Sequence, residues 1–327
     1  MAGEDLARIV EEAARSGSGA TIDLADRGRG LMLGLAIGNA LGVRTEFWDA
    51  EEIAAAHPAG LREIDPAEHL HPWDDDVAQA AILAEAMLDG NGRMTCEDLA
   101  RRLTVWFDDN ARGIGNLTYR LVESWKRGVP AADASRRAWE EIHPRAAGNG
   151  AVMRCAPVAL RWHGNGDVLV EETVRSCLVT HYDPRCVMSC LAFNVALAVT
   201  LGGGTMDLER LARAVPEETH DEGQTTDAIR AAASGKPETM QLDREPGSGY
   251  TLLALQVGLW AATDGTDFEE TLVRIVSRGG DTDTNGAVAG AALGARFGAR
   301  AIPARWIEGL REPQRLIELA DALVAPS

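Results

Sequence analysis

Two stretches of sequence constrain the fold most strongly: GLMLGLAIGNALG at residues 30–42 and GAVAGAALGARFG at residues 286–298. In each stretch a glycine recurs at every fourth residue: Gly30, Gly34, Gly38 and Gly42, then Gly286, Gly290, Gly294 and Gly298. Residues four apart share one face of an α-helix, and a helical glycine costs about 1 kcal/mol relative to alanine. The stripes therefore predict two helices at the centre of the fold, each with the backbone of another element packed closely against its glycine face.

The same helical periodicity continues outward from these stretches. Apolar residues recur at intervals of three and four, as in residues 78–88 and 187–201, and with three Tyr and five Phe no segment shows the period-two alternation of a strand. The pattern predicts an all-α protein with helices at 28–45, 77–90, 95–109, 114–127, 131–142, 151–163, 167–179, 185–202, 207–214, 222–233, 249–264, 267–278, 284–298 and 312–324. The polar stretch at residues 235–248 indicates a loop. Because the helical pattern continues on both sides of it, we expect one domain over 1–327.

Composition narrows the possible partners and the compartment. The chain has 32 Lys+Arg against 50 Asp+Glu, a net charge of −18, and no run of five basic residues, which opposes nucleic-acid binding. The uncharged run from Gly30 to Val43 is 14 residues, too short for the ~20 that span a bilayer, so no membrane partner is expected. Five cysteines without a CxxC pair, and an N-terminus without a signal-like apolar run, predict a cytoplasmic protein.

The first candidate for chemistry is the acidic triplet Asp74, Asp75 and Asp76, which directly precedes a predicted helix. One aspartate can cap the helix, but three adjacent carboxylates raise one another's ionisation cost unless a cation lies close. They predict a hard-metal site. The alternative is a solvated acidic turn that supplies one cap.

A second oxygen-rich segment stands at the start of the second glycine-striped helix. Asp281, Asp283 and Thr284 follow Gly279 and Gly280. Residues two apart in a helix diverge by about 200°, so Asp281 and Asp283 can converge on one ion only if Asp281 lies in the turn before the helix. Ligation by oxygen alone suits Mg²⁺ or Mn²⁺ better than zinc.

Three further segments suit an anionic, nucleotide-like substrate. GNGAVMR, from Gly148 to Arg154, opens a predicted helix and offers backbone N–H groups to a phosphate. His181 stands at a joint between two helices, where it either donates to a phosphate or ribose oxygen or has a structural role. Ser248-Gly249-Tyr250 is either a plain helix start or a turn that contacts ribose. Trp73 either stacks on a substrate ring or packs beneath the acidic loop.

Six motifs, in this order, resemble the ADP-ribosylglycohydrolase family from about residue 28 to residue 310. They are GLAIGNALGVRTEF, WDDDVAQAAILAEAML, ARGIGNLT, GNGAVMRCAPV, THYDP and GGDTDTNGAVAGAALGA. The resemblance implies a compact, orthogonal bundle of helices with two Mg²⁺ or Mn²⁺ ions in a central cleft. It also implies hydrolysis of the bond at the ribose C1 of an ADP-ribosyl group.

The resemblance also implies roles for individual residues. Those that fall on the family's metal ligands are Asp74, Asp75, Asp76, Asp281, Asp283 and Thr284. Those placed near the scissile bond as catalytic groups are Glu46, Asp75 and Asp76. Those expected to contact the substrate are Trp73, Gly148, Asn149, Gly150, Met153, Arg154, His181, Ser248, Gly249 and Tyr250. Three positions depart from the family's pattern, which has Asp at Asn39, Thr at Asp74 and Thr at Val77.

These observations predict a metal-dependent hydrolase that cleaves the glycosidic bond at the ribose C1. Its substrate would be an ADP-ribosylated protein side chain or a small molecule derived from ADP-ribose or NAD. The alternative is an inactive relative that keeps the fold for binding or structure, as the three departures would allow. A helical phosphohydrolase ranks last, because its usual His-Asp pair occurs only at His220-Asp221, far from the other motifs.

Overall fold

Two antiparallel helices, α2 (Leu24–Gly42) and α15 (Thr282–Phe297), form the centre of the fold. They belong to a computed structural model that describes residues 2–16, 22–69, 73–109, 111–143, 147–215, 223–243 and 249–325. A Cβ built on Gly34 would overlap the carbonyl group of Gly290, and one on Gly38 that of Gly286. The two glycine stripes therefore face each other, which confirms that both helices are central and closely approached.

The last glycine of the second stripe is not part of the helix. Helix α15 begins at Thr282, two residues earlier than predicted, and ends at Phe297. Gly298 follows it with a φ of +78°, in the left-handed region that glycine tolerates without strain. Gly298 lies at the Gly30 end of the pair, whereas at the other end a Cβ built on Gly42 would overlap the Thr282 carbonyl. The contact at this end of the pair is therefore between a glycine and the first turn of α15.

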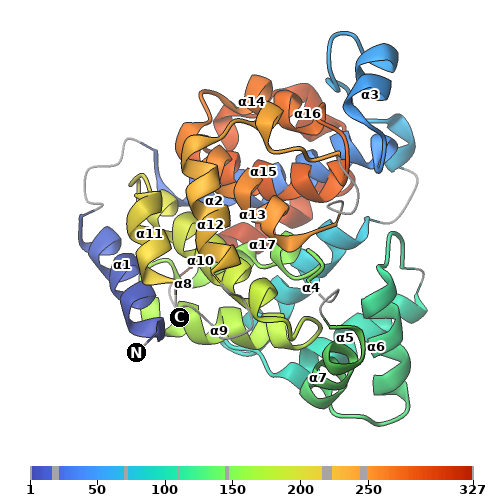
Figure 1. Ribbon diagram of the computed structural model, residues 1–327, viewed down its shortest axis with the longest axis vertical. Helices are drawn as coiled ribbons and strands as arrows, with labels where there is room; N and C mark the ends of the chain where they lie inside the picture. Colours follow the sequence, from blue (N-terminus) through green and yellow to red (C-terminus); the bar gives the residue numbers. More distant parts are fainter. Residues whose placement is uncertain are drawn as a thin grey trace.

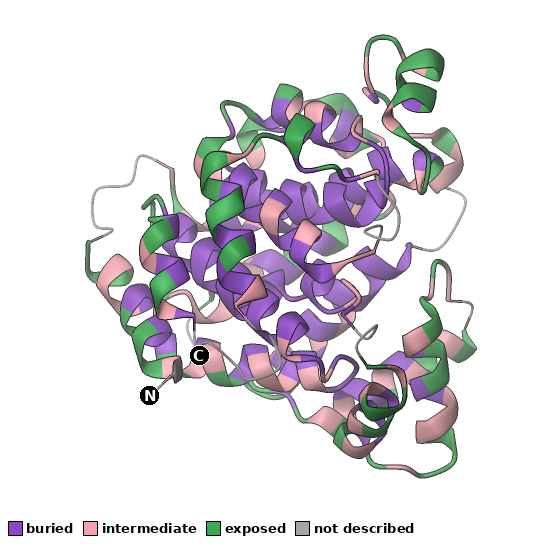
Figure 2. Ribbon diagram, in the orientation of Figure 1, coloured by how far each residue is buried: buried purple, intermediate pink, exposed green. Residues whose placement is uncertain are grey.

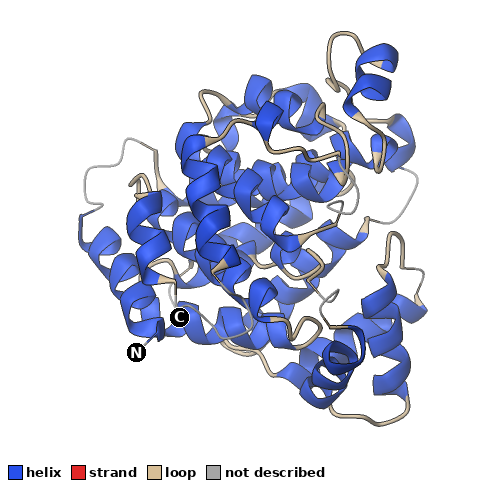
Figure 3. Ribbon diagram, in the orientation of Figure 1, coloured by secondary structure: helices blue, strands red, loops and turns tan. Residues whose placement is uncertain are grey.

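The other described residues surround this pair with helices joined by loops and turns (Figure 3). Besides α2 and α15, they are α1 (Ala2–Ser16), α3 (Ala50–Ala56), α4 (Asp75–Asp89), α5 (Cys96–Asp108), α6 (Asn116–Lys126), α7 (Ala131–Ile142), α8 (Ala156–Trp162), α9 (Gly166–Leu178), α10 (Pro184–Leu201), α11 (Leu208–Ala214), α12 (Gln224–Ser234), α13 (Thr251–Asp264), α14 (Phe268–Val276), α16 (Ala304–Glu308) and α17 (Pro313–Val324). The described residues contain no strand, and Gly148 and Tyr250 form an isolated bridge. The all-α prediction is confirmed.

The buried apolar residues of the core are concentrated on and around α2 and α15 (Figures 1 and 2). Helices α13 and α14 pack on α15, α17 packs on α2, and α10 packs on α13. Helices α5, α6 and α7 lie together at the lower right of Figure 1, and Leu121, Ala134 and Ala138 make a small separate apolar cluster there. Helix α10 is long and apolar enough to cross a membrane, but 94% of that segment is buried inside the protein. It is a core helix of this fold.

Some predicted elements differ in the structure. The helix predicted at 151–163 is divided into a 3₁₀ turn, Val152–Arg154, and α8. Pro157 lies in the first turn of α8, where its missing N–H group costs nothing. Helices α1, α3 and α16 were not among the predicted ones. Helices α3 and α16 have 7 and 5 residues, too few for the repeat to be recognised, whereas α1 does carry it, at Leu6, Ile9, Val10 and Ala13, and was missed.

Candidate active site

Two helix starts supply the acidic residues of the site. Asp74 and Asp281 occupy the N-cap positions of α4 and α15, and neither side chain accepts a capping hydrogen bond. By contrast, Asp23 and Asp267 do cap α2 and α14 with their side chains. Asp281 therefore lies in the turn before the helix, as predicted. Neither carboxylate caps its own helix: Oδ2 of Asp281 accepts from Asn149, and Asp74 has Arg112 at 3.9 Å.

A pair of backbone hydrogen bonds brings a third segment to this place. The Phe47 N–H donates to the Gly280 carbonyl at 2.7 Å, and the Gly280 N–H donates to the Trp48 carbonyl at 2.8 Å. Gly280 adopts a φ of +75°, which allows its backbone to turn toward this segment. Residues 46–48, which follow α2, are thereby fixed to the turn that carries Asp281.

The result is a cluster of three carboxylates. Ligand oxygens of Glu46, Asp281 and Asp283 all lie within 4.8 Å of one another. Buried oxygens of Asp76 and Asp283, one Oδ1 from each, have no hydrogen-bond partner within the described residues. Unpartnered buried carboxylate oxygens are costly unless a cation lies close. The donor set therefore fits a hard divalent cation bound by oxygen.

The electrostatics of the cluster agree with this fit. Burial, followed by the charges of Asp281 and Asp74, raises the pKa of Glu46 to about 7. Burial together with neighbouring carboxylates also raises the pKa values of Asp75, Asp76 and Asp283 well above their ordinary range. The site concentrates negative charge that only a cation or protons can offset.

The three departures from the family pattern have separate structural consequences. Asn39 donates from Nδ2 to Oδ2 of Asp76 at 3.4 Å, so an amide supports this carboxylate. The extra carboxylate, Asp74, has Arg112 at 3.9 Å, although burial still raises the pKa of Asp74. Val77 packs in the apolar core. All three substitutions are accommodated without dispersing the acidic cluster.

The cluster forms one wall of a cavity of about 440 Å³. The predicted site residues that line it are Glu46, Asp75, Gly148, Asn149, Gly150, Met153, His181, Gly249, Asp281, Asp283 and Thr284. Asn149 donates from Nδ2 to Oδ2 of Asp281 at 2.9 Å, so the glycine-rich segment contacts the acidic wall directly. These predicted residues come from six separate parts of the sequence and surround one space.

Asp74 and Asp76 are buried and do not line the cavity. Asp76 lies beneath the acidic wall, where it forms a hydrogen bond with Thr284. Asp74 lies against Gly113, which has a φ of +72° and no room for a side chain. The triplet therefore presents only Asp75 to the cavity, because successive residues at a helix start point in different directions.

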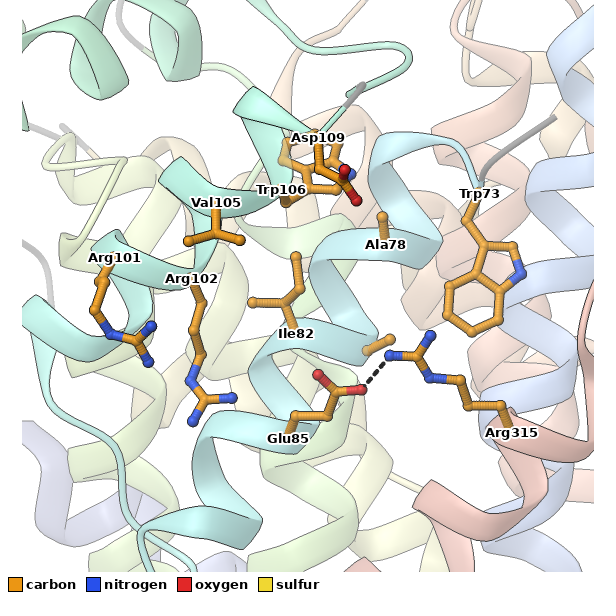
Figure 4. Close-up of a pocket in the computed structure, with 11 residues that line it drawn as sticks. Trp73, Ala78, Ile82, Glu85, Arg101, Arg102, Val105, Trp106, Asp109 and Arg315 are labelled. Carbon is orange, nitrogen blue, oxygen red and sulfur yellow. Dashed lines mark hydrogen bonds and ion pairs between the residues drawn. The ribbon is translucent and has the colours of Figure 1, made fainter. Parts of the chain in front are cut away.

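Trp73 lies in a different pocket, between α4, α5 and α17 (Figure 4). Its Nε1 donates to the Arg311 carbonyl at 2.9 Å, and the Arg315 guanidinium lies over its ring, 5.2 Å from the centroid. Figure 4 shows the ring beside Arg315, which pairs with Glu85. This position favours the packing role over stacking on a substrate in the acidic cavity.

Arg154 and Tyr250 also lie away from the cavity. Arg154 is 1% exposed and donates to Gln79, Ser176 and Thr180. The Tyr250 hydroxyl donates to Oε1 of Gln224 at 3.0 Å. Neither residue is among those that line the cavity, although Tyr250 pairs with the lining residue Gly148. Ser248 lies outside the described residues.

Sequence reasoning missed part of the cavity wall. The additional lining residues are Phe47, Gly113, Gly115, Asn116, Leu117, Thr118 and Ile142. Five of them belong to ARGIGNLT, one of the motifs that carried the resemblance, so the motif was a usable signal. Phe47 adjoins Glu46 and has a φ of +66°, which no sequence pattern reveals. Ile142, at the end of α7, has no distinguishing sequence signal.

Comparison with known proteins agrees with this geometry. The family model described as ADP-ribosylglycohydrolase matches residues 20–327. The chain belongs to the ADP-ribosylglycohydrolase family. It is a hydrolase of the class that cleaves ADP-ribosyl glycosidic bonds, and the predicted family, fold and enzyme class are confirmed.

This ADP-ribosylglycohydrolase is similar to several named proteins. It is 28% identical to "ADP-ribosylarginine hydrolase Tri1" of Pseudomonas putida, over 91% of this chain and 78% of that protein. It is 28% identical to "ADP-ribosyl-[dinitrogen reductase] glycohydrolase" of Rhodospirillum rubrum, over 92% of this chain and 96% of that one. A solved structure called "ADP-ribosylglycohydrolase-related protein complex" matches with a TM-score of 0.71 and 30% identity, covering 92% of this chain and 98% of that chain.

Proposed function

We propose that this ADP-ribosylglycohydrolase hydrolyses the bond between the ribose C1 of an ADP-ribosyl group and a protein side chain, and that it needs a divalent cation. The observation that carries the proposal is the cluster of Glu46, Asp281 and Asp283 at the wall of the cavity. A carboxylate cluster with unpartnered oxygens is a poor structural element, because it destabilises the folded chain unless a cation is present.

Two Mg²⁺ or Mn²⁺ ions are the proposed cofactors. The residues that would hold them are Glu46, Asp74, Asp75, Asp76, Asp281, Asp283 and Thr284, all of which offer oxygen ligands. The ions would supply Lewis-acid polarisation of the ribose oxygens at the scissile bond. Histidine and cysteine, the usual zinc ligands, do not line the acidic wall among the described residues, apart from His181 on the glycine-rich side.

The side chains supply the proton transfer and the charge stabilisation. A water attacks C1 and loses a proton to a carboxylate, the bond from C1 to the leaving nitrogen or oxygen breaks, and that proton then passes to the leaving group. Glu46 lines the cavity, and we assign it the role of general base that takes the proton from the attacking water. The positive charge that develops on the ribose is stabilised by the fixed carboxylates around it.

The proposed substrate class is an ADP-ribosylated protein side chain. Relatives are named for hydrolysis of ADP-ribosylarginine and of ADP-ribosylated dinitrogen reductase, and this supports a protein acceptor. Small molecules derived from ADP-ribose or NAD are the alternative within the same chemistry. We also propose that the protein acts in the cytoplasm, without nucleic-acid or membrane partners.

The test is release of ADP-ribose from a panel of substrates, with and without Mg²⁺ or Mn²⁺. The panel holds ADP-ribosyl-arginine, ADP-ribosyl-serine, O-acetyl-ADP-ribose and NAD-derived molecules. Cation-dependent release from a protein-type substrate would support the proposal, and release only from a small molecule would replace the substrate class.

A pair of variants tests the site itself. Asp283→Asn should abolish cation-dependent release and weaken Mn²⁺ binding in titration calorimetry, because it removes one ligand charge. Asp167→Asn, which changes an exposed aspartate at the start of α9, is the matched control and should do neither. If Asp283→Asn retains full cation-dependent turnover, the proposed site is wrong. Weak Mn²⁺ binding and silence by the unmodified protein would instead favour the inactive alternative.

A further inference from the structure

Arg154 is a buried cation that does not line the cavity but is connected to two residues that do. Gln79 links it to Asp75, and Thr180 links it to His181. Nη1 of Arg154 donates to Oε1 of Gln79, and its Nη2 donates to Oγ1 of Thr180 at 2.6 Å and to the Ser176 carbonyl at 3.3 Å. A guanidinium has donors and no acceptor. Each of its partners must therefore accept, and this fixes how the partners can bond to other groups.

The hydrogen bond from Arg154 fixes the orientation of the Gln79 side-chain amide. Because Oε1 of Gln79 faces Arg154, its Nε2 group is left to face the acidic wall. That Nε2 donates to Oδ2 of Asp75 at 3.4 Å. Arg154 thus supports, through Gln79, the only aspartate of the triplet that lines the cavity.

Through Thr180, Arg154 also fixes a proton on the imidazole of His181. Thr180 Oγ1 contacts two groups among the described residues, Arg154 and Nδ1 of His181, the latter at 2.7 Å. The hydroxyl has two acceptor lone pairs and one proton, so it could accept from both Arg154 and Nδ1, but its own buried proton would then have no acceptor among the described residues. Donation of that proton to Nδ1 satisfies all three groups, and it puts the ring proton of the neutral imidazole on Nε2.

The Nε2 edge faces the substrate side. His181 lines the cavity, and a Cβ on Gly150 would lie 3.2 Å from its Nε2 and 2.9 Å from its Cε1. A side chain at position 150 would therefore cover this edge. Burial and the nearby charge of Arg154 lower the pKa of His181 to about 3, so the ring is uncharged.

We infer that Arg154 is a positioning residue: through Thr180 it holds His181 as the Nε2–H tautomer, a neutral hydrogen-bond donor to a phosphate or ribose oxygen in the cavity. The identity of that oxygen rests on the proposed function, whereas the tautomer does not. A neutral donor suits this place because a charged imidazolium would compete with the cations proposed for the acidic wall.

The test uses Thr180→Val, which removes the hydroxyl and nearly conserves the volume. Truncating Arg154 would leave a large cavity and unpaired groups in the core, so the relay is the better target. Thr180→Ser restores the hydroxyl and is the rescue variant. Thr200→Val is the matched control, because Thr200 is also buried on a core helix and its hydroxyl bonds only the Ala196 carbonyl among the described residues.

Two readouts separate positioning from a structural role. ¹⁵N NMR of the imidazole, assigned with His181→Gln, reports the tautomer, and calorimetry reports the Kd for ADP-ribose with Mg²⁺ present. The unmodified protein should show the Nε2–H pattern. In Thr180→Val the His181 ring should populate both neutral tautomers, and the variant should bind ADP-ribose about three- to tenfold more weakly. Thr180→Ser and Thr200→Val should keep the Nε2–H tautomer and the affinity of the unmodified protein.

The outcomes are distinct from those of the proposed function. An Nδ1–H tautomer in the unmodified protein would overturn the inference, as would a Thr180→Val protein with unchanged tautomer and affinity. A protein that binds ADP-ribose but releases none from the substrate panel would contradict the proposed function and leave this inference standing. A protein that neither binds ADP-ribose nor releases it from any member of the panel would overturn the proposed function and the ligand assigned to His181, while the tautomer would still be decided by the NMR measurement.

Discussion

Replacing Gly42 by alanine should damage both the packing of α2 on α15 and the active site, whereas the same change at Gly30 should damage the packing alone. A Cβ on Gly42 would lie 2.5 Å from the amide nitrogen of Asp283, at the end of the pair that carries the acidic cluster. A Cβ on Gly30 would lie 2.8 Å from the amide nitrogen of Ala299, at the opposite end. At 1.5 Å per residue the two positions are about 18 Å apart along the helix.

The size of each effect follows from what obstructs the new methyl group. Overpacking costs about 1–3 kcal/mol, and the upper end applies because the obstructing atoms are backbone, so the two helices must separate as units. Alanine recovers about 1 kcal/mol of helix propensity. Each variant should therefore lose roughly 2 kcal/mol, which lowers the melting temperature by about 3 °C in a chain of this size.

The catalytic effect should differ between the two positions. A displacement of about 1 Å at the reacting groups costs on the order of 100-fold in rate. Gly42→Ala should therefore lower kcat/KM by about that factor and weaken Mn²⁺ binding, because the new methyl group pushes on the peptide group between Thr282 and Asp283. Gly30→Ala should leave kcat/KM within about threefold, since the disturbance lies far from the site.

The assay is thermal unfolding together with Mn²⁺ calorimetry and release of ADP-ribose for both variants. Gly164→Ala is the control, because a Cβ there meets no atom within 4 Å, and it should not lower stability. If Gly30→Ala is as stable as the unmodified protein, the glycines are not required for close helix approach. If both stripe variants lose activity equally, the damage spreads along the helices and the local argument is refuted.

Three other measurements test separate parts of the structure. Without divalent cations, the free energy of unfolding should be higher at about pH 5.5 than at about pH 8. In the folded protein the pKa values of Asp75, Asp76 and Asp283 are raised above the unfolded value of about 4. The stability present at low pH is therefore lost as the pH rises through the pKa values of the folded state. Added Mn²⁺ should then raise the melting temperature more at about pH 8, and an equal gain at both pH values would contradict this account. Trp73→Ala should lower the melting temperature and leave KM for the substrate unchanged, because the ring packs with Arg315 outside the acidic cavity; a raised KM with unchanged stability would favour stacking on the substrate. Phe47→Gly should keep or slightly raise the melting temperature measured by calorimetry, because the position has a φ of +66° and the side chain is 63% exposed; a clear loss of stability would show that the ring packs in solution.

Parts of the active site could be predicted because they are local properties of the chain. Asp74 and Asp281 stand at helix starts, and a helix start is visible in the order of polar and apolar residues. The pair Gly279 and Gly280 indicated a turn, and both residues do adopt a φ of +75°. The glycine stripes indicated close approach, because a repeated cost in helix propensity needs a compensating contact.

Other features depended on which segments meet, and the sequence alone does not contain that information. Periodicity shows which face of a helix is apolar but not which element covers it. Arg154 and Asn149 are neighbours in one motif, yet Asn149 contacts Asp281 at the cavity while Arg154 points into the core toward Thr180. Trp73, directly before the acidic triplet, lines a separate pocket between α4, α5 and α17.

The sequence by itself determined the all-helical class, the two glycine-striped helices and the acidic residues at two helix starts, because each depends on residues within one or two turns of one another. Only the tertiary structure decided that the stripes face each other, that Glu46 joins Asp281 and Asp283, and that His181 and Asp75 share one buried arginine. These contacts join residues from distant parts of the chain. Their partners are selected by the packing of the whole core, in which each helix can be placed only where its neighbours leave room.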